Sequence, residues 1–345
     1  MANILYETKC NDGILMNANE SYYNINEAML QAFKDALNQV EFHRYPIDDS
    51  PALRKAYANY IGVEAENVMV GNGSDEMLGL IISLSIKGGK KVLTLDPDFS
   101  MYDYYTSMAN GELLKYPMGP DTVFDVYDFI EFGRRNNIEM ILFSNPNNPT
   151  GRSMTQAELI KIIEAFPRNL VVIDEAYADF ADFTMLPYIH QYPNLVILRT
   201  MSKAFGMAGI RCGFMVACTS TMNTIYPYKV PYNVNVLTQA MAEIALQHLD
   251  LVDHFLEEVK QNRDTFYAAY QAMELAGITL YPSQANYIYG VCDKKQAFLT
   301  ALKKRNLSIR DYRDETSFRI TIDTLEHNNA VLAAIREVFA KEKSI

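Results

Sequence analysis

Short apolar runs that are rich in β-branched residues alternate with longer amphipathic stretches over the first two-thirds of the chain. Six such runs are expected strands, at residues 67–70, 91–95, 140–143, 170–173, 195–198 and 213–217. Strands of this length that alternate with helical stretches are typical of a mostly parallel sheet covered by helices. The sequence therefore predicts an α/β fold.

Polar residues directly follow five of these expected strands. The segments 71–75 and 96–99 follow the first two, and Asn145, Asp174 and Lys203 come at or soon after the ends of the next three. In open α/β sheets, ligands bind at the carboxyl ends of the strands. We expect these side chains, which are spread over the sequence, to meet at one edge of the sheet.

The pattern changes after residues 226–232. One long helical stretch is expected over 237–276, and half-buried strands are expected near 285–289, 307–310 and 318–322. These features predict a second, smaller α+β domain. The expected division is an N-terminal segment (1–35) that joins the small domain, a large domain (36–235) and a small C-terminal domain (236–345).

Composition excludes several classes of protein. The chain has 345 residues, of which 49% are hydrophobic, so it can bury a large core and a smaller one. Its net charge is -11 without a long basic run, which argues against a nucleic-acid partner. The 4 cysteines form no Cys-x-x-Cys pair and the 5 histidines show no metal-ligand spacing, which argues against a metal site. The sequence also shows neither a secretory leader nor a long apolar span. We expect a cytoplasmic enzyme with no metal and no membrane partner.

Lys203 is the candidate catalytic residue, because upstream residues supply the partners that a Schiff-base lysine needs. The aldehyde of pyridoxal phosphate must bond a lysine, and its ring nitrogen favours a carboxylate. Asp174 would hold that nitrogen protonated, Asn148 and Tyr177 would bind the ring oxygen, and Tyr102 would stack on the ring. Lys203 would then move a proton between the substrate carbon and the cofactor, as a base whose pKa is lowered. Lys203, Asp174 and Tyr177 are the predicted catalytic set.

A second group of residues would hold the phosphate of the same cofactor. Gly73, Ser74 and Asp75 begin an expected helix, and the exposed N–H groups at a helix start bind anions. Ser202 adds a hydroxyl and Arg211 a fixed positive charge. Glycine allows the backbone to approach the phosphate closely.

Each motif also has a purely structural interpretation when it stands alone. A single lysine is usually a solvated surface charge, and segment 145–151 is rich in turn residues. Asp174 could cap the helix after its strand, Tyr102 could be core packing, and Arg319 could be the outward member of an alternating strand. The order of the motifs along one chain favours the combined site over any of these interpretations.

Taken together, these motifs resemble those of the fold-type I pyridoxal-phosphate aminotransferases, and most closely the histidinol-phosphate aminotransferases. The resemblance covers nearly the whole chain and implies an aspartate-aminotransferase-like three-layer sandwich with a smaller α+β domain. The segments that carry it are 19–20, 44–46, 71–76, 145–151, 174–177, 199–211, 231–235, Asn286 and 319–322.

The resemblance also implies partners and substrate contacts. It implies a homodimer in which Tyr45 reaches the cofactor phosphate of the opposite subunit, so that the active sites are shared. Arg319 would take the anionic end of the substrate, helped by Arg310, Tyr23 and Asn148, because guanidinium groups suit both carboxylate and phosphate.

The implied reaction is reversible amino transfer from histidinol phosphate to 2-oxoglutarate, which gives imidazole-acetol phosphate and glutamate in a ping-pong cycle through pyridoxamine phosphate. Alternatives are amino transfer from aromatic or other amino acids, a threonine-phosphate-type decarboxylation, and a pyridoxal-phosphate sensor without turnover. The sequence departs from the family pattern at the substrate end. The stretch before Asn19 is short, segment 19–24 lacks the usual proline, and Asp323 replaces a glycine.

Overall fold

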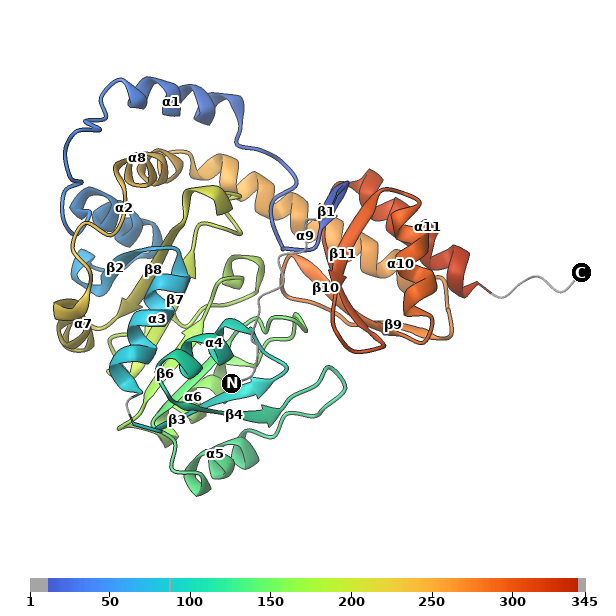
Figure 1. Cartoon of the computed structure of the whole chain (residues 1–345), viewed down its shortest axis with the longest axis horizontal. Coiled ribbons are helices and arrows are strands. Elements are labelled where there is room, and N and C mark those ends of the chain that lie inside the picture. The colour runs from blue at the N-terminus through green and yellow to red at the C-terminus, as the bar shows by residue number, and fades with distance from the viewer. Residues whose placement is uncertain (1–11, 87, 341–345) are drawn as a thin grey trace, which may run out of the picture.

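A large, mostly parallel sheet forms the centre of the protein in a computed structural model that describes residues 12–86 and 88–340 (Figure 1). Among these residues the sheet has seven strands, in the order β2 (Val68–Asn72), β8 (Cys212–Ala217), β7 (Leu195–Thr200), β6 (Leu170–Asp174), β5 (Met140–Ser144), β3 (Lys91–Asp96) and β4 (Glu112–Pro117). Only β8 runs antiparallel to its neighbours. All six expected strands are confirmed, and β4 is an additional edge strand.

Helices cover both faces of this sheet, because alternate residues of each strand point to opposite sides. In β6, Val171 and Ile173 belong to one core and Val172 to the other. The core around Val172 is completed by α3 (Ser74–Ser85), α4 (Met101–Met108) and α7 (Thr219–Ile225). The core around Ile173 is completed by α2 (Pro51–Ile61), α5 (Val126–Arg135), α6 (Gln156–Ala165) and α8 (Val236–Ala245). The three-layer arrangement is therefore confirmed.

The single long helix expected over 237–276 is wrong. The chain forms α8 and then α9 (Leu249–Gln271), and between them His248 has a non-helical backbone, with φ -120 and ψ 46. The apolar spacing continues across this break, so periodicity alone could not show that the helix axis changes. No helix in the described part of the chain is both long and apolar enough to cross a membrane.

A smaller mixed sheet lies beside the large domain (Figure 1). Within the described residues its order is β1 (Ile14–Met16), β11 (Leu307–Asp311), β12 (Ser317–Thr321), β10 (Tyr287–Cys292) and β9 (Ile278–Leu280). Helices α10 (Lys295–Lys303) and α11 (Leu325–Phe339) pack together beside it. Short 3-10 helices lie at Ala65–Asn67, Ala178–Phe180, Leu186–Tyr188, Ala208–Ile210 and Tyr226–Tyr228.

The N-terminal segment contacts both the small sheet and a helix that packs on the large sheet. Its strand β1 pairs in parallel with β11, whereas α1 (Glu27–Leu37) packs against α8. The expected division of the chain at residues 35 and 235 stays a prediction.

A buried ion-pair network fixes the loop that follows β6. Arg199 in β7 is only 4% exposed. Its Nε donates to Glu175 Oε2 at 3.1 Å, and its Nη1 donates to Asp179 Oδ1 at 2.7 Å. Removing one member of such a network leaves the other charges buried without a partner. The network therefore holds segment 174–177 in place, which contains two of the predicted site residues.

Replacing Arg199 by methionine is expected to lower the free energy of unfolding by about 3–5 kcal/mol, because Glu175 and Asp179 would lose their buried counter-charge. Urea unfolding followed by circular dichroism measures this change. The matched control is Lys90→Met, which removes an exposed pair with Glu139 at 2.6 Å and is expected to cost less than about 1 kcal/mol. Equal losses in the two variants would contradict the role given to Arg199.

Candidate functional site

Strands β5 and β6 end level with each other, the neighbouring β7 continues for two more residues, and predicted site residues lie at or after all three ends. Ser144 at the end of β5 lies opposite Asp174 in β6, and Asp174 lies opposite Leu198 in β7. Lys203 comes just after β7, and the hydroxyl of Tyr102 in α4 donates to Asp174 Oδ2 at 3.0 Å. The structure thus places Asp174, Lys203 and Tyr102 at one edge of the large sheet.

Asp174 is a buried carboxylate with hydrogen bonds on both oxygens. Its Oδ1 accepts from the backbone N–H of Ala176 at 3.1 Å, and its Oδ2 accepts from Tyr102. Burial raises the pKa of Asp174 to about 6, although these two bonds act in the opposite direction. At neutral pH the group is mostly an anion, which suits a positively charged ring nitrogen.

Tyr102 is fully buried beside this carboxylate, and its ring packs edge-on against Phe99 with centroids 5.7 Å apart. The structural interpretation of Tyr102 as core packing is therefore correct for its ring. Stacking on a cofactor stays a prediction.

Asp98 is a second carboxyl at this edge that the sequence analysis missed as a site residue. Its Oδ1 accepts from Ser144 Oγ at 2.5 Å and from the backbone N–H of Phe99 at 2.8 Å. Desolvation raises the pKa of Asp98 to about 8, and the charge of Asp174 acts in the same direction. Its place in the segment that follows β3 was the only available signal. Within the described ranges, no cluster of three or more His, Cys, Asp or Glu side chains could hold a metal ion.

The amine of Lys203 lies between the carboxyl ends of the strands in the large sheet and the N-terminal segment. Its Nζ donates to the carbonyl oxygen of Ala18 at 2.8 Å and lies 5.9 Å from the centre of the Tyr177 ring. Burial and then the positive charge of Arg319 lower the pKa of Lys203 to about 8. At neutral pH about a tenth of the amine is therefore neutral, far more than at the ordinary lysine pKa.

Tyr177, whose ring lies under this amine, also has a hydrogen-bonded hydroxyl. The hydroxyl oxygen accepts a hydrogen bond from Asn19 Nδ2 at 2.9 Å. Burial raises the pKa of Tyr177 to about 12, even though Arg319 and the bond from Asn19 lower it. The phenol keeps its proton at neutral pH. Asn19 entered the sequence analysis only as part of a family motif, and no role was given to it.

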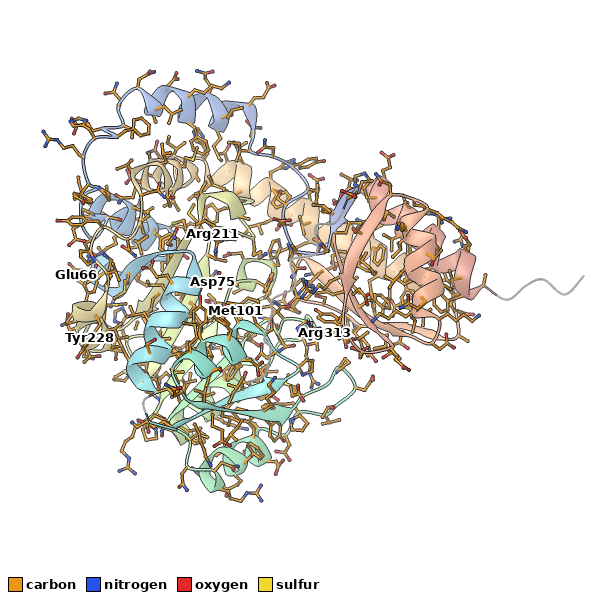
Figure 2. The ribbon with its side chains drawn as sticks, viewed as in Figure 1. Glu66, Asp75, Met101, Arg211, Tyr228 and Arg313 are labelled. Atoms are coloured by element: carbon orange, nitrogen blue, oxygen red, sulfur yellow. The ribbon has the colours of Figure 1, made fainter. Side chains whose placement is uncertain are left out.

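The turn from β2 into α3 has the features of an anion site. Gly73 has a φ of 80, and a Cβ there would lie 2.7 Å from Arg211 Nη2. Arg211 Nη2 pairs with Asp75 Oδ2 at 3.0 Å, and both side chains are labelled near the start of α3 (Figure 2). Exposed N–H groups from Ser74 onward and this guanidinium favour a bound anion. Ser202, also predicted here, is buried in the turn after β7.

Arg319 joins the small domain to the loop that follows β5. Its Nη1 donates to Asn148 Oδ1, and its Nη2 donates to the carbonyl oxygen of Asn17 at 3.0 Å. In the register of β11 and β12, Arg310 lies opposite Arg319. The structure therefore brings together Arg319 and Asn148, two of the four residues predicted to bind substrate, with Arg310 on the neighbouring strand.

Tyr45 is not brought into the site of its own chain. Its side chain is 81% exposed, and its ring stacks on Tyr232 with centroids 5.1 Å apart. The predicted contact with the opposite subunit stays a prediction.

The departures from the family pattern have structural consequences. Where the proline is missing, the hydroxyls of Tyr22 and Tyr23 both donate to Glu258 Oε1 in α9, at 3.1 and 3.2 Å. Tyr23 is 51% exposed, and the structure gives it this contact rather than one with the other site residues. The carboxylate of Asp323 pairs with His327 Nδ1 at 2.6 Å near the start of α11. Tyr23 as a substrate ligand stays a prediction.

Lys203→Met is expected to stabilise the protein without added cofactor, because it removes a buried amine that resists protonation. The pKa of Lys203 is about 8 in the folded state, below its ordinary value of 10.5. The folded state therefore binds fewer protons than the unfolded state between these two values. The gain should be on the order of 2 kcal/mol below pH 8 and should vanish as the pH rises to about 10.5. Urea titrations across this range measure it, and a pH-independent difference would contradict the lowered pKa.

Residues 11–335 match the family model described as aminotransferase class I and II. A histidinol-phosphate aminotransferase from Clostridium novyi is 34% identical over 326 residues, which cover 94% of this chain and 91% of the relative.

Two solved structures share the fold. The histidinol-phosphate aminotransferase from Sinorhizobium meliloti, in complex with pyridoxal-5'-phosphate, has a TM-score of 0.83 at 23% identity and covers 95% of this chain and 90% of its own. The aspartate aminotransferase from Thermus thermophilus with maleate has a TM-score of 0.78 at 19% identity, with coverage of 95% and 92%. The chain belongs to the class I and II aminotransferase family, with the aspartate-aminotransferase-like fold of type I.

Proposed function

We propose that this chain is a pyridoxal-phosphate-dependent enzyme that transfers the amino group of histidinol phosphate to 2-oxoglutarate, giving imidazole-acetol phosphate and glutamate. The proposal rests on one observation. The amine of Lys203, whose pKa is lowered to about 8, and the buried carboxylate of Asp174 lie together at the carboxyl ends of the central strands. The choice of substrate is supported by the curated relative, which is named for that activity.

The residues present fit pyridoxal phosphate. The N–H groups that follow Gly73 and the guanidinium of Arg211 suit the phosphate, and a Cβ at Gly73 would fill the space that Arg211 occupies. Asp174 suits the ring nitrogen, and Asn148 and Tyr177 suit the ring oxygen. When bound, the cofactor supplies an aldehyde that bonds an amine and a ring that withdraws electrons from the substrate carbon.

Lys203 would do two things in this site. Its neutral amine is the nucleophile that holds the cofactor covalently, and once released it is the base that takes and returns the proton of the substrate carbon. Both tasks need an unprotonated Nζ near neutral pH. Burial and then the positive charge of Arg319 favour this form, because both lower the pKa of Lys203.

Asp174 would keep a positive charge on the ring nitrogen. Its carboxylate is held in place by Tyr102 and by the backbone N–H of Ala176, so it does not need to reorganise when charge develops on the ring. A preoriented carboxylate in a buried site acts more strongly than one in water.

Arg319 and Arg310 would bind the anionic end of each substrate. Guanidinium groups form paired hydrogen bonds with both carboxylate and phosphate, so one site can accept glutamate and histidinol phosphate in turn. The bond from Arg319 to Asn148 connects this end to the loop predicted to hold the ring oxygen.

A homodimer with shared active sites is part of the proposal. Three large side chains between α1 and α2 are highly exposed, namely Phe42, Tyr45 and Ile47. A group of exposed apolar residues on a soluble chain typically marks a contact with another protein. The described cysteines are free and buried, which supports a reducing compartment and a cytoplasmic location.

We expect histidinol phosphate, added without a keto acid, to remove the visible absorbance of the cofactor-loaded protein faster than glutamate or aromatic amino acids do. Addition of 2-oxoglutarate should restore it, since the amino group would return to a keto acid. Borohydride reduction followed by peptide mass spectrometry should find the cofactor on Lys203, and Lys203→Ala should abolish both signals.

Other outcomes would select a different function. Faster reaction with phenylalanine or tyrosine indicates an aromatic aminotransferase. Carbon dioxide release from threonine phosphate indicates a decarboxylase, and a bound cofactor that responds to no amine indicates a sensor. Trapping of the cofactor on another lysine would contradict the assignment of Lys203.

A hybrid dimer tests the proposed role of Tyr45. Homodimers of Tyr45→Ala should bind the cofactor on the order of ten-fold more weakly, because a phosphate contact is lost, and homodimers of Lys203→Ala should be inactive. At a cofactor concentration that half-saturates the unmodified protein, a purified hybrid of one subunit of each kind should recover about half of the normal activity, since one of its two sites would contain both intact residues. A hybrid with no more activity than the Tyr45→Ala homodimer would place Tyr45 outside the partner's site.

A further inference from the structure

Asn19 lies at a junction between the two domains and the N-terminal segment. It is 0% exposed, and its φ of 55 is in the left-handed region that asparagine tolerates better than most residues. Its side chain reaches Tyr177 in the large domain, and its backbone and side chain reach Thr321 and Asn286 in the small domain. Every polar group of Asn19 is used in these bonds.

The contacts with Thr321 determine which way the Asn19 amide faces. The backbone N–H of Asn19 donates to Thr321 Oγ1 at 3.0 Å, so the threonine oxygen acts as an acceptor there. The Thr321 hydroxyl donates its own proton to Asn19 Oδ1 at 3.2 Å. Because the amide oxygen faces Thr321, the amide nitrogen faces Tyr177.

The orientation of this amide in turn fixes the polarity of the Tyr177 hydroxyl. The phenol oxygen accepts from Asn19 Nδ2 at 2.9 Å, so its own proton points to a different acceptor. Tyr177 keeps that proton at neutral pH, because burial raises its pKa to about 12. The hydroxyl is therefore a donor aimed away from Asn19, in a site where Lys203 Nζ lies over the Tyr177 ring, 5.9 Å from its centre.

We propose that Asn19 is a positioning residue, which orients the Tyr177 hydroxyl as a donor to the ring oxygen of the cofactor and makes this orientation depend on the contact between Asn19 and the small domain. The inference rests on the proposed function, since it requires that Tyr177 faces a pyridoxal ring. It assigns Asn19 a task separate from holding substrate.

The orientation has a measurable electrostatic effect. A hydrogen bond donated to an anionic oxygen stabilises the anion. Stabilising the ring oxygen as an anion lowers the pH at which the visible absorbance of the lysine-bound cofactor changes. Loss of the donor should therefore raise the pH midpoint of this absorbance change. The same direction is expected whether the Tyr177 hydroxyl is removed or only loses its orientation.

Asn19→Gly tests the proposal most directly, because it removes the side-chain amide alone. Glycine accepts a φ of 55 without strain, so the backbone bonds to Thr321 and Asn286 can remain while the amide is lost. The pH midpoint of the cofactor absorbance should rise by about one unit, which corresponds to a ten-fold change in proton affinity. Asn110→Gly is the control, because Asn110 is exposed and has the same φ of 55, and it should leave the midpoint unchanged.

A double-mutant cycle separates positioning from a general loss of structure. Tyr177→Phe should raise the midpoint, and Asn19→Gly added to Tyr177→Phe should cause almost no further shift, since Asn19 would act through the hydroxyl. Thr321→Val should shift the midpoint in the same direction by a smaller amount, and Thr321→Ser should not. Apparent affinity for pyridoxal phosphate, measured by fluorescence on the unloaded protein, gives a second readout that does not depend on turnover.

The outcomes distinguish this inference from the proposed function. An unchanged midpoint in Asn19→Gly, with the cofactor still trapped on Lys203, overturns the role of Asn19 alone. Equal shifts from Asn19→Gly with and without the Tyr177 hydroxyl overturn it as well, because Asn19 would then act by another route. If the unmodified protein binds no pyridoxal phosphate, both the proposed function and this inference fall.

Discussion

The register of three adjacent parallel strands is the constraint on which the site depends. Strands β5, β6 and β7 pair in parallel, with Ser144 opposite Asp174 and Asp174 opposite Leu198. The first two strands end at this level and β7 ends two residues later, at Thr200, so the polar side chains at or after the three strand ends lie on the same side of the sheet. A shift of one residue in any strand would turn its side chains to the other face of the sheet, and Asp174 would then no longer meet Tyr102.

Burial at this edge changes the chemistry of the groups that it holds. Desolvation lowers the pKa of Lys203 to about 8 and raises that of Asp174 to about 6. The lowered pKa makes Lys203 a better base near neutral pH, whereas Asp174 is still mostly an anion there. The positive charge that assists Lys203 comes from Arg319 in the small domain, so the chemistry of the site draws on both domains.

The N-terminal segment connects these two parts. It adds β1 to the small sheet, it accepts the hydrogen bond from Lys203 at Ala18, and it places Asn19 between Tyr177 and Thr321. Few contacts of this kind could be expected from the sequence, because the partners are between 158 and 302 positions apart. The two tyrosines that replace the family's usual loop residues attach the same segment to α9 through Glu258.

The sequence by itself determined the strands, the parallel sheet and the residue types at the strand ends. These follow from local patterns of apolar residues and from the rule that ligands bind at carboxyl edges. It did not reveal the break at His248, because apolar spacing continues through the turn, or the role of Asp98, because a lone aspartate after a strand has many uses.

Only the tertiary structure decided which polar groups face one another. Tyr102 meets Asp174, Arg319 meets Asn148, and Asn19 orients toward Tyr177. The direction of a hydrogen bond and the burial of a polar group depend on neighbours that are distant in the chain. The order of residue types along the sequence gives no information on either.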